Sequence, residues 1–307
     1  MRILVTGSRG FIGSHLLKKL EDENQEIIYL GKADIRKPDI YSLAGMGGID
    51  RIYHLASNPS PVKYTGKLLE TIETNVIGTE NMLELAKKTG ARVLFTSTVD
   101  AGNYFSPENP RSGYVDSKKV AEDLSFIYRQ EYGVDVRVLR LYSVYGPGME
   151  AGDGRVIPNF ICGALRGHDI TISGDGSQFD SFCYVDDMVP GLINFMESDK
   201  NSFNMPIEIG YYPPIRICDL ASKIIELSES ESRVVNSFGK GVFADRCPDL
   251  TKAVEIIGWK PETSIEGGLF KTIEYFRDIL EDDPEADNMG GYEGQCSNVC
   301  ATRGVLR

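Results

Sequence analysis

The residues that decide the fold are Thr6-Gly7-Ser8-Arg9-Gly10-Phe11-Ile12-Gly13, which follow directly on an apolar run at residues 3–5. The glycines are three residues apart, and an amphipathic helical pattern follows them. A glycine turn between a strand and a helix is the usual binding place of a dinucleotide pyrophosphate, because backbone N–H groups at the start of the helix face the phosphates. We expect Gly7 to form the tight turn, Gly10 to let the backbone approach a phosphate, and Gly13 to let the helix pack on the strand.

Short apolar runs alternate with helical patterns through the first half of the chain. The runs typical of buried strands are residues 3–5, 26–30, 51–55, 92–96 and 135–141. The helical patterns are residues 11–20, 68–88 and 115–132. This alternation predicts an α/β fold with a Rossmann-type, doubly wound parallel sheet, to which residues 205–209 are expected to return. Residues 31–50 leave little room for a full helix and an extra strand between the second and third strands.

A change of pattern at Ser143 predicts a second part of the molecule, because glycine and proline become frequent from there. Short helices are expected at residues 159–166, 186–197, 217–228 and 265–279. We expect an NAD(P)-binding Rossmann domain at residues 1–142, which regains residues 186–210 from the second half. Residues 143–280 then form a smaller, discontinuous mixed α/β substrate-binding lobe, and residues 281–307 form a C-terminal tail.

Composition and charge exclude several classes of partner. The chain has 307 residues, of which 41% are apolar, and a formal net charge of −12. That charge argues against nucleic acid or an anionic membrane as partner, because both bind clustered Lys and Arg. The sequence shows no signal peptide and no apolar run of membrane-spanning length, so we expect a cytoplasmic protein. Cys296 and Cys300 lie close together, but two ligands make a poor zinc site, and we expect no metal.

Tyr114 and Lys118 lie one helical turn apart, which places a phenol and an ammonium on one helix face. A tyrosine with the ordinary pKa of about 10 is a poor base at neutral pH. The ammonium and a positive nicotinamide ring both favour the phenolate, so that Tyr114 accepts an alcohol proton while hydride leaves for the nicotinamide. Thr98, near the end of the fourth strand, is placed to hydrogen-bond that alcohol. These three residues predict an enzyme that transfers hydride at a secondary alcohol.

The residues after the second strand bear on the type of nicotinamide cofactor. The acid that would bind the adenosine ribose is absent, and Gly31 and Lys32 stand in its place. We expect NAD, while Lys32 leaves NADP open because a cation would favour the 2′-phosphate. Further contacts are expected from Asp34 and Ile35 at the adenine and from Leu55, Ala56 and Ser57 along the cofactor. His54 is interpreted as a histidine packed at the end of an apolar strand.

Further motifs accompany the glycine turn and the set of Thr98, Tyr114 and Lys118. They are His54-Leu-Ala-Ser57, Thr74-Asn75-Val-Ile-Gly78-Thr79, Val144-Tyr-Gly-Pro147, Gly174-Asp-Gly-Ser-Gln178 and Pro248-Asp-Leu-Thr-Lys-Ala253. With them the chain resembles the extended short-chain dehydrogenases/reductases, the NAD-dependent epimerase/dehydratase family of sugar-nucleotide enzymes. Within that family it is most similar to the UDP-glucuronate decarboxylases, through Ala56-Ser-Asn-Pro-Ser-Pro61 with Tyr64 and through Asp153-Gly-Arg-Val156 with Asn159.

The resemblance implies a reaction through a transient 4-keto sugar nucleotide, in which a β-keto carboxylate loses CO2 readily. Beside Tyr114 and Lys118, it implies cofactor contacts at Phe11, Ile12, Asn75, Thr96, Tyr142 and Val144. It implies substrate contacts at Pro61, Tyr64, Ser143, Arg155, Val156, Asn159 and Arg246. Asp100 stands at the position of the catalytic glutamate of the decarboxylases, and its alternative role is to cap a loop. The resemblance also implies a homodimer in which helices 68–88 and 115–132 form a four-helix bundle.

Several positions depart from the decarboxylase pattern and leave the reaction open. Ser143, Gly148 and Asp180 stand where the family carries one Asn and two Arg residues. An aspartate at the third position would repel a pyrophosphate, so the substrate is either a nucleotide sugar or another polyol. A decarboxylase or a 4-epimerase ranks above a dehydratase, because Val99 breaks the acidic pair that dehydration uses. The alternatives are an NADPH-dependent reductase and a cofactor-binding regulator without turnover.

Overall fold

The computed structural model describes two compact units of the chain. Unit 1 comprises Met1–Gly146, Ser181–Pro214 and Arg246–Ile265, and unit 2 comprises Pro147–Asp180, Ile215–Asp245 and the chain from Glu266. The described residues are 1–30, 33–46, 48–64, 66–103, 105–106, 109, 111–199, 205–237 and 244–283. Lys32, Cys296, Cys300 and the rest of the tail beyond residue 283 lie outside them, as do the side chains of residues 44–46, 63 and 64.

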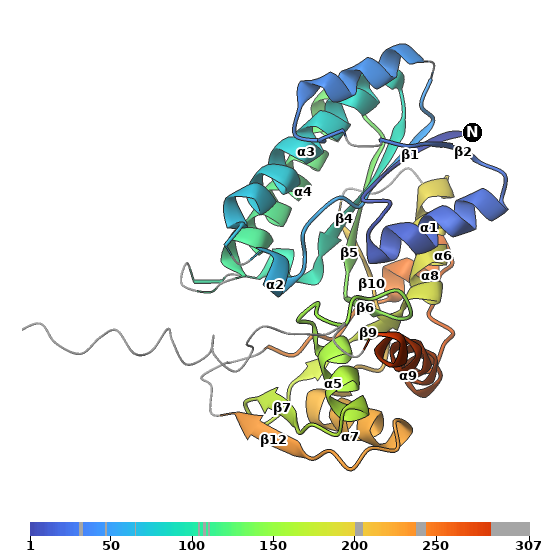
Figure 1. Ribbon diagram of the computed structural model, residues 1–307. Coiled ribbons are helices and arrows are strands. Elements are labelled where there is room, and N and C mark those ends of the chain that lie inside the picture. The colour runs from blue at the N-terminus through green and yellow to red at the C-terminus, as the bar shows by residue number, and fades with distance from the viewer. Residues whose placement is uncertain are drawn as a thin grey trace, which may run out of the picture. The chain divides into compact units, whose positions relative to one another are not determined.

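A six-stranded sheet forms the centre of unit 1 (Figure 1). Its strands are β1 (Arg2–Thr6), β2 (Glu26–Ile28), β3 (Arg51–His54), β4 (Arg92–Thr98), β5 (Val136–Leu141) and β10 (Ile207–Ile209). All pairs are parallel, in the order β10-β5-β4-β3-β1-β2. A parallel sheet is buried on both faces, which explains why these strands are apolar without alternation. The predicted Rossmann-type fold and the return of the chain to the sheet at β10 are confirmed.

Helices cover both faces of this sheet. They are α1 (Phe11–Asp22), α3 (Leu68–Thr89), α4 (Ser112–Tyr132), α6 (Val185–Glu197), α8 (Thr251–Ile257) and a 3-10 helix at Pro38–Met46. Val5 of β1 joins an apolar cluster with residues of α1, α6 and α8. Leu4, its neighbour, joins a second cluster with residues of α3 and α4. Successive residues of a strand point to opposite faces, so β1 is held between the two helical layers.

The carboxyl ends of three strands meet at one edge of the sheet. Thr6 of β1 is paired with His54 of β3, and His54 is paired with Phe95 of β4. The glycine turn, residues 55–57 and the 3-10 turn Val99–Gly102 therefore all leave the sheet at this edge. In a doubly wound fold this is the edge at which ligands bind. The nearby short elements of unit 1 are α2 (Pro61–Tyr64), β6 (Ser143–Tyr145) and β9 (Phe182–Tyr184).

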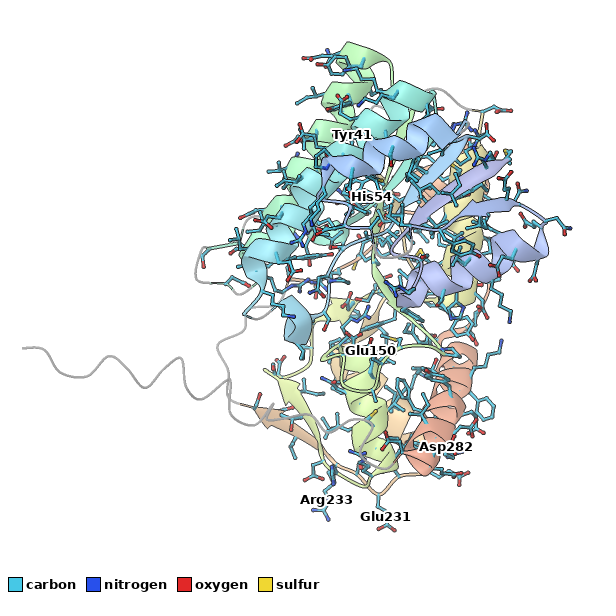
Figure 2. All side chains as sticks on the ribbon, turned by 45° about the horizontal axis from the view of Figure 1, so that its top comes forward. Tyr41, His54, Glu150, Glu231, Arg233 and Asp282 are labelled. Carbon is cyan, nitrogen blue, oxygen red and sulfur yellow. The ribbon has the colours of Figure 1, made fainter. Side chains whose placement is uncertain are left out.

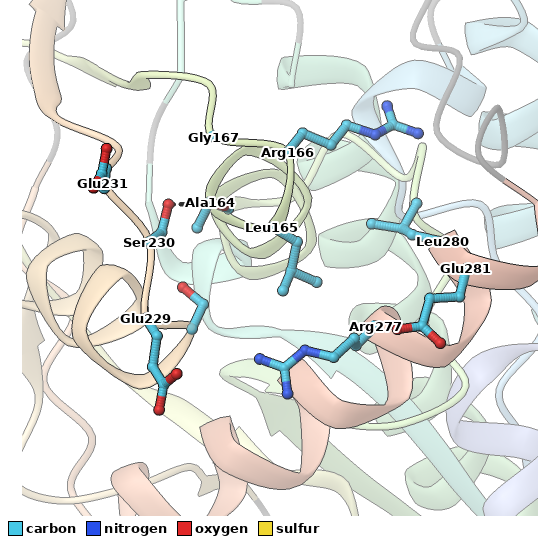
Figure 3. A pocket seen from close by; sticks show the side chains of 11 residues that line it. Ala164, Leu165, Arg166, Gly167, Glu229, Ser230, Glu231, Arg277, Leu280 and Glu281 are labelled. Carbon is cyan, nitrogen blue, oxygen red and sulfur yellow. Dashed lines mark hydrogen bonds between the residues drawn. The ribbon is translucent and has the colours of Figure 1, made fainter.

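The described residues of unit 2 form helices and two small sheets. The helices are α5 (Val156–Leu165), α7 (Ile217–Leu227) and α9 (Ile265–Asp282). β7 (Ile170–Ser173) pairs in parallel with β12 (Val234–Ser237), and β8 (Phe179–Asp180) pairs antiparallel with β11 (Ile215–Arg216). A pocket of about 690 Å³ lies at the ends of the helices, with Arg166, Arg277 and Glu281 among its lining residues (Figure 3). In the part of the chain that the structure describes, no helix is both long and apolar enough to cross a lipid bilayer.

Candidate active site

The glycine turn has contacts that exclude larger side chains. Gly7 has a φ of +71°, and a Cβ on it would lie 2.8 Å from the backbone nitrogen of Ala56, two residues after β3. A Cβ on Gly13 would lie 2.2 Å from the carbonyl oxygen of Gly7. Both positions therefore require glycine. The contact of Gly13 differs from the expected one, because its nearest neighbours belong to the turn itself and not to the strand.

The turn fits a dinucleotide at the position of Gly10. Gly10 caps α1, and its backbone N–H donates to the Gly7 carbonyl at 2.9 Å. A Cβ on Gly10 would meet only that carbonyl oxygen, at 3.2 Å, among the described atoms within 4 Å. The space above its Cα is open, and the first N–H groups of α1, from Phe11 and Ile12 onward, face the end of the helix. This is the cradle that a pyrophosphate requires.

The residues expected at the adenine form a rigid group. Arg36 donates to both carboxylate oxygens of Asp34, at 2.7 to 3.1 Å, and this lowers the pKa of Asp34 to about 2. The carbonyl of Ile35 accepts a hydrogen bond of 2.8 Å from Asn81 of α3. A Cβ on Gly78 would lie 2.6 Å from the Ile35 side chain, so α3 packs directly on it. Asp34 and Ile35 are thus fixed against α3, whereas Lys32 lies outside the described residues.

The predicted catalytic residues are all buried in unit 1. Thr98 ends β4, and Tyr114 and Lys118 lie in the first two turns of α4, with exposed fractions of 9%, 8% and 2%. The Lys118 ammonium donates to the carbonyl of Thr96 at 2.9 Å. Burial lowers the pKa of Lys118 to about 7, against an opposing effect from Glu122. A carbonyl is a weak substitute for water, so the site is suited to an additional acceptor such as a phenolate or a ribose hydroxyl.

Asp100 binds two arginines. It follows Thr98 in the 3-10 turn, is 2% exposed, and its backbone N–H donates to the Thr98 hydroxyl oxygen at 3.3 Å. Its Oδ2 accepts from Arg246 at 2.8 Å and also from Arg111. The carboxylate thus faces two guanidinium groups and is not the cap of the turn, a position that Thr98 takes. Arg246 was expected at the substrate, whereas Arg111 was missed by the sequence analysis.

The other residues expected at the cofactor lie in unit 1. Asn75 of α3 accepts from the Ser57 hydroxyl at 2.7 Å and donates to Ser117 at 2.9 Å. Thr96 of β4 donates through its hydroxyl to the carbonyl of His54 at 3.2 Å. Leu55 and Ala56 follow β3 beside the glycine turn, and the Tyr142 hydroxyl donates to Glu208 at 3.0 Å. Val144 is buried in β6.

The residues expected at the substrate are divided between the units. Pro61, Tyr64, Ser143 and Arg246 belong to unit 1, whereas Arg155, Val156 and Asn159 belong to unit 2, at the start of α5. Arg155 is paired with Asp153. The side-chain oxygen of Asn159 is buried and has no hydrogen-bond partner among the described residues. A buried acceptor without a partner is costly, so Asn159 is suited to a ligand.

Comparisons with known proteins agree on the kind of protein this chain resembles. A family model described as the NAD dependent epimerase/dehydratase family matches residues 3–210. UDP-glucuronic acid decarboxylase 6 of Arabidopsis thaliana is 40% identical over 309 residues, which cover 90% of this chain and 89% of that protein. UDP-glucuronic acid decarboxylase 1 of Xenopus tropicalis is 37% identical over 312 residues, which cover 91% of this chain and 73% of that protein.

Solved structures give the same picture. A crystal structure of UDP-glucose 4-epimerase from Thermotoga maritima with UDP-glucose is 30% identical and has a TM-score of 0.81, covering 91% of this chain and all of that one. UDP-glucuronic acid 4-epimerase from Bacillus cereus, in complex with UDP-glucuronic acid and NAD, is 27% identical with a TM-score of 0.78 at the same coverage. The similarity in sequence and in structure thus extends over nine tenths of the chain.

Proposed function

The chain belongs to the NAD-dependent epimerase/dehydratase family, and on that premise we propose that it decarboxylates UDP-glucuronic acid through a 4-keto intermediate with NAD as its cofactor. The observation that carries this proposal is the pair of guanidinium groups, from Arg111 and Arg246, on Asp100 beside Thr98. They concentrate positive charge next to the catalytic residues of a chain whose net charge is −12. Arginine is the side chain best matched to a carboxylate. The relatives named as UDP-glucuronic acid decarboxylases support the same substrate.

The reaction assigns a separate role to each catalytic residue. NAD would be held at the glycine turn of Gly7, Gly10 and Gly13 and would supply the hydride acceptor for C4 and the hydride donor for the return step. Tyr114 accepts the proton of the C4 hydroxyl, while the Lys118 ammonium stabilises the phenolate and Thr98 hydrogen-bonds the C4 oxygen. The C5–C6 bond then breaks, its electron pair moves toward the C4 carbonyl, CO2 leaves, and C5 takes up a proton from solvent. Tyr114 finally returns its proton to the C4 oxygen. The net change is a carboxylate and a proton converted to CO2 and a C–H bond.

Asp100 acts in this proposal as a positioning residue for the two arginines. Its carboxylate is bound to Arg111 and Arg246 and is therefore directed away from proton transfer. A second candidate is 4-epimerisation of the same sugar nucleotide, in which the ketone is reduced from its opposite face without loss of carbon. The structural similarity to UDP-glucuronic acid 4-epimerase favours this candidate. The two reactions use the same carboxylate-binding arginines and differ in the fate of C6.

NAD is proposed over NADP because carboxylates outnumber guanidinium groups around Arg36, the described arginine two residues after Asp34. The Arg36 guanidinium donates to the Asp34 carboxylate. One of its terminal nitrogens also lies 3.2 Å from a carboxylate oxygen of Glu73 and 3.7 Å from one of Glu70. A 2′-phosphate near this group would meet three carboxylates, which repel it. We expect a clearly lower affinity for NADP than for NAD in a binding titration, and equal affinities would contradict this choice.

We also propose that the protein is a homodimer and acts in the cytoplasm on a small-molecule substrate. α3 and α4 pack side by side (Figure 1), and their outward residues include Ile77, Val120 and Ile127, which are 41%, 45% and 45% exposed. Exposed apolar residues on adjacent helices support a four-helix interface. The free thiols of Cys162 and Cys183 support a reducing compartment.

Tyr114→Phe tests the proposed function. The variant lacks the proton acceptor, so turnover of UDP-glucuronic acid should fall by about 10²- to 10⁴-fold while the NAD content of the purified protein stays unchanged. Retained turnover would refute the assigned base. Wild-type protein that is isolated without nicotinamide and consumes added NADPH would favour the reductase. Bound NAD without turnover of any sugar nucleotide would favour the regulator.

A further inference from the structure

We propose that His54 is a positioning residue of the hydride-transfer site, which acts through Thr79, Asn75 and Ser117 to fix the backbone of Tyr114 relative to the glycine turn. The proposal rests on the proposed function in so far as Tyr114 is taken as the proton acceptor. The sequence analysis interpreted His54 only as a packed residue. The hydrogen bonds of its two ring nitrogens in unit 1 indicate a more specific role, the positioning of neighbouring elements.

His54, labelled in Figure 2, lies in the buried interior of unit 1, and its ring nitrogens contact residues of two elements. Its Nδ1 lies 2.7 Å from the Thr6 hydroxyl at the end of β1, directly before the glycine turn. Its Nε2 lies 3.0 Å from the Thr79 hydroxyl in α3. The side chain is 1% exposed, and burial lowers the pKa of His54 to about 3. The imidazole is therefore neutral at physiological pH and has one donor and one acceptor nitrogen.

The hydroxyl partners determine which nitrogen carries the proton. Thr79 donates its hydroxyl hydrogen to the carbonyl of Asn75 at 2.5 Å, so it can only accept from His54. Nε2 of His54 is then the donor, and Nδ1 accepts the hydroxyl hydrogen of Thr6. Thr6 in turn accepts the backbone N–H of Ala56 at 3.2 Å. Every donor and acceptor in this series is used once in a single direction, which fixes the tautomer.

A second series leads from Asn75 to the catalytic helix. The Asn75 side chain accepts from Ser57 at 2.7 Å and donates to Ser117 at 2.9 Å. Ser117 donates to the carbonyl of Tyr114 at 2.8 Å. Asn75 is thus held through its backbone by Thr79 and through its side chain by α4 and residue 57. His54 is the link that ties this group to β1 and to the glycine turn.

The arrangement joins the two parts of the site that must meet for hydride transfer. Thr6 and Ala56 belong to the edge that carries the expected cofactor contacts, and Ser117 lies in the helix that carries Tyr114 and Lys118. A misplacement of about 1 Å between reacting groups costs about a hundredfold in rate. Apolar packing does not account for this arrangement, because Nδ1 and Nε2 of His54 lie closer to the two hydroxyl oxygens than the carbon atoms of an apolar ring could lie.

Thr79→Val tests the proposal, because it keeps the shape of the side chain and removes the acceptor of His54. We expect kcat for UDP-glucuronic acid to fall about 10- to 100-fold with little change in KM, and Thr79→Ser to restore it. His54→Phe should behave like Thr79→Val. The matched control is Thr272→Val in α9, where an equally buried threonine makes the same bond to the carbonyl four residues earlier, at 2.6 Å to Gly268. This control should lose stability without a change in kcat.

A second measurement is independent of turnover. Amide hydrogen exchange at residues 112–118 should become faster in Thr79→Val than in wild type and Thr79→Ser, with the remainder of α4 unchanged. Thr79→Val with wild-type kcat and wild-type exchange at residues 112–118 would overturn the proposal. Wild-type protein that does not act on UDP-glucuronic acid would instead contradict the proposed function, and the exchange measurement would still decide the role of His54.

Discussion

Lys118 is the residue whose chemistry the fold changes most. Its ammonium is 2% exposed and donates to the neutral carbonyl of Thr96, so burial lowers its pKa from 10.5 to about 7. A shift of one pKa unit corresponds to about 1.4 kcal/mol of free energy. The folded protein is therefore less stable with this lysine charged than with an apolar group in its place. The same burial strengthens the effect of the ammonium on a nearby phenolate.

Lys118→Met should stabilise the unliganded protein and abolish turnover. The pKa of Lys118 is lower in the folded than in the unfolded state, so its penalty is fully present below pH 7 and disappears as the pH rises to 10.5. The variant should have the higher Tm at pH 6, and its advantage should narrow steadily above pH 7. Thermal unfolding followed between pH 6 and pH 9.5 checks this. A constant difference in Tm would show that Lys118 is not desolvated.

Arg111→Gln should weaken the binding of the carboxylate substrate. The variant removes one of the two guanidinium groups on Asp100, and a hydrogen bond to a charged group contributes about 1.5–3 kcal/mol. We expect KM for UDP-glucuronic acid to rise about 10- to 100-fold in steady-state kinetics. Lys119→Gln is the control, because this lysine of α4, the helix that follows Arg111, is 45% exposed and pairs with Asp123. An unchanged KM in Arg111→Gln would remove the arginine pair from the substrate site.

From the sequence alone, Asp100 and Arg246 were named as site residues, but Arg111 and the pairing of both arginines with Asp100 were missed, because these residues come together only by folding. Tyr114 and Lys118 lie one turn apart in a helix, so their proximity follows from sequence alone. Asp100 and Arg111 are eleven positions apart, and Asp100 and Arg246 are 146 apart. No local sequence pattern predicts pairs at such separations. The sequence signal that could have pointed to Arg111 is its position directly before the helix that contains Tyr114. The contacts of His54 were missed for the same reason, since its partners lie in β1 and α3.

The long elements of unit 1 were predicted well because their environment is uniform. The central strands are buried on both faces, and α1 and α3 carry clear apolar faces, so both give strong signals. α4 begins at Ser112, three residues before the predicted start. Its first turn contains Gly113, and glycine is a poor helix former, so this turn gives a weak helical signal in the sequence. None of the short strands outside the central sheet was predicted; β8 and β11, for example, have two residues each, which carry no periodicity.

Gly13→Ala should disrupt the turn between β1 and α1. The added methyl group would lie 2.2 Å from the Gly7 carbonyl oxygen, and backbone must move to admit it. We expect a loss of about 1–3 kcal/mol in the free energy of unfolding and weaker binding of NAD. Denaturant unfolding and a cofactor titration measure the two effects. Gly48→Ala, whose methyl group would meet nothing within 4 Å, should change neither. Normal NAD binding in Gly13→Ala would argue against the cradle.

The molecule as a whole is expected to dimerise through α3 and α4. Val120→Glu combined with Ile127→Glu places two charges on the exposed apolar face of α4 and should convert the dimer to a monomer. Light scattering at micromolar concentration checks the mass of both proteins. A monomeric wild type would contradict the proposed interface. The parallel fold and the family followed from the sequence, but the oligomer and the substrate depend on surfaces and partners that strand and helix patterns do not describe.

We propose that the protein removes C6 of UDP-glucuronic acid as CO2 at a site built from Thr98, Tyr114 and Lys118. The most direct measurement is incubation of the wild-type protein with UDP-glucuronic acid labelled with ¹³C at C6. We expect the label to be released as CO2 and a UDP-pentose to remain, with no net consumption of NAD. A label that stays in the sugar, with C4 inverted or with the substrate unchanged, would contradict it.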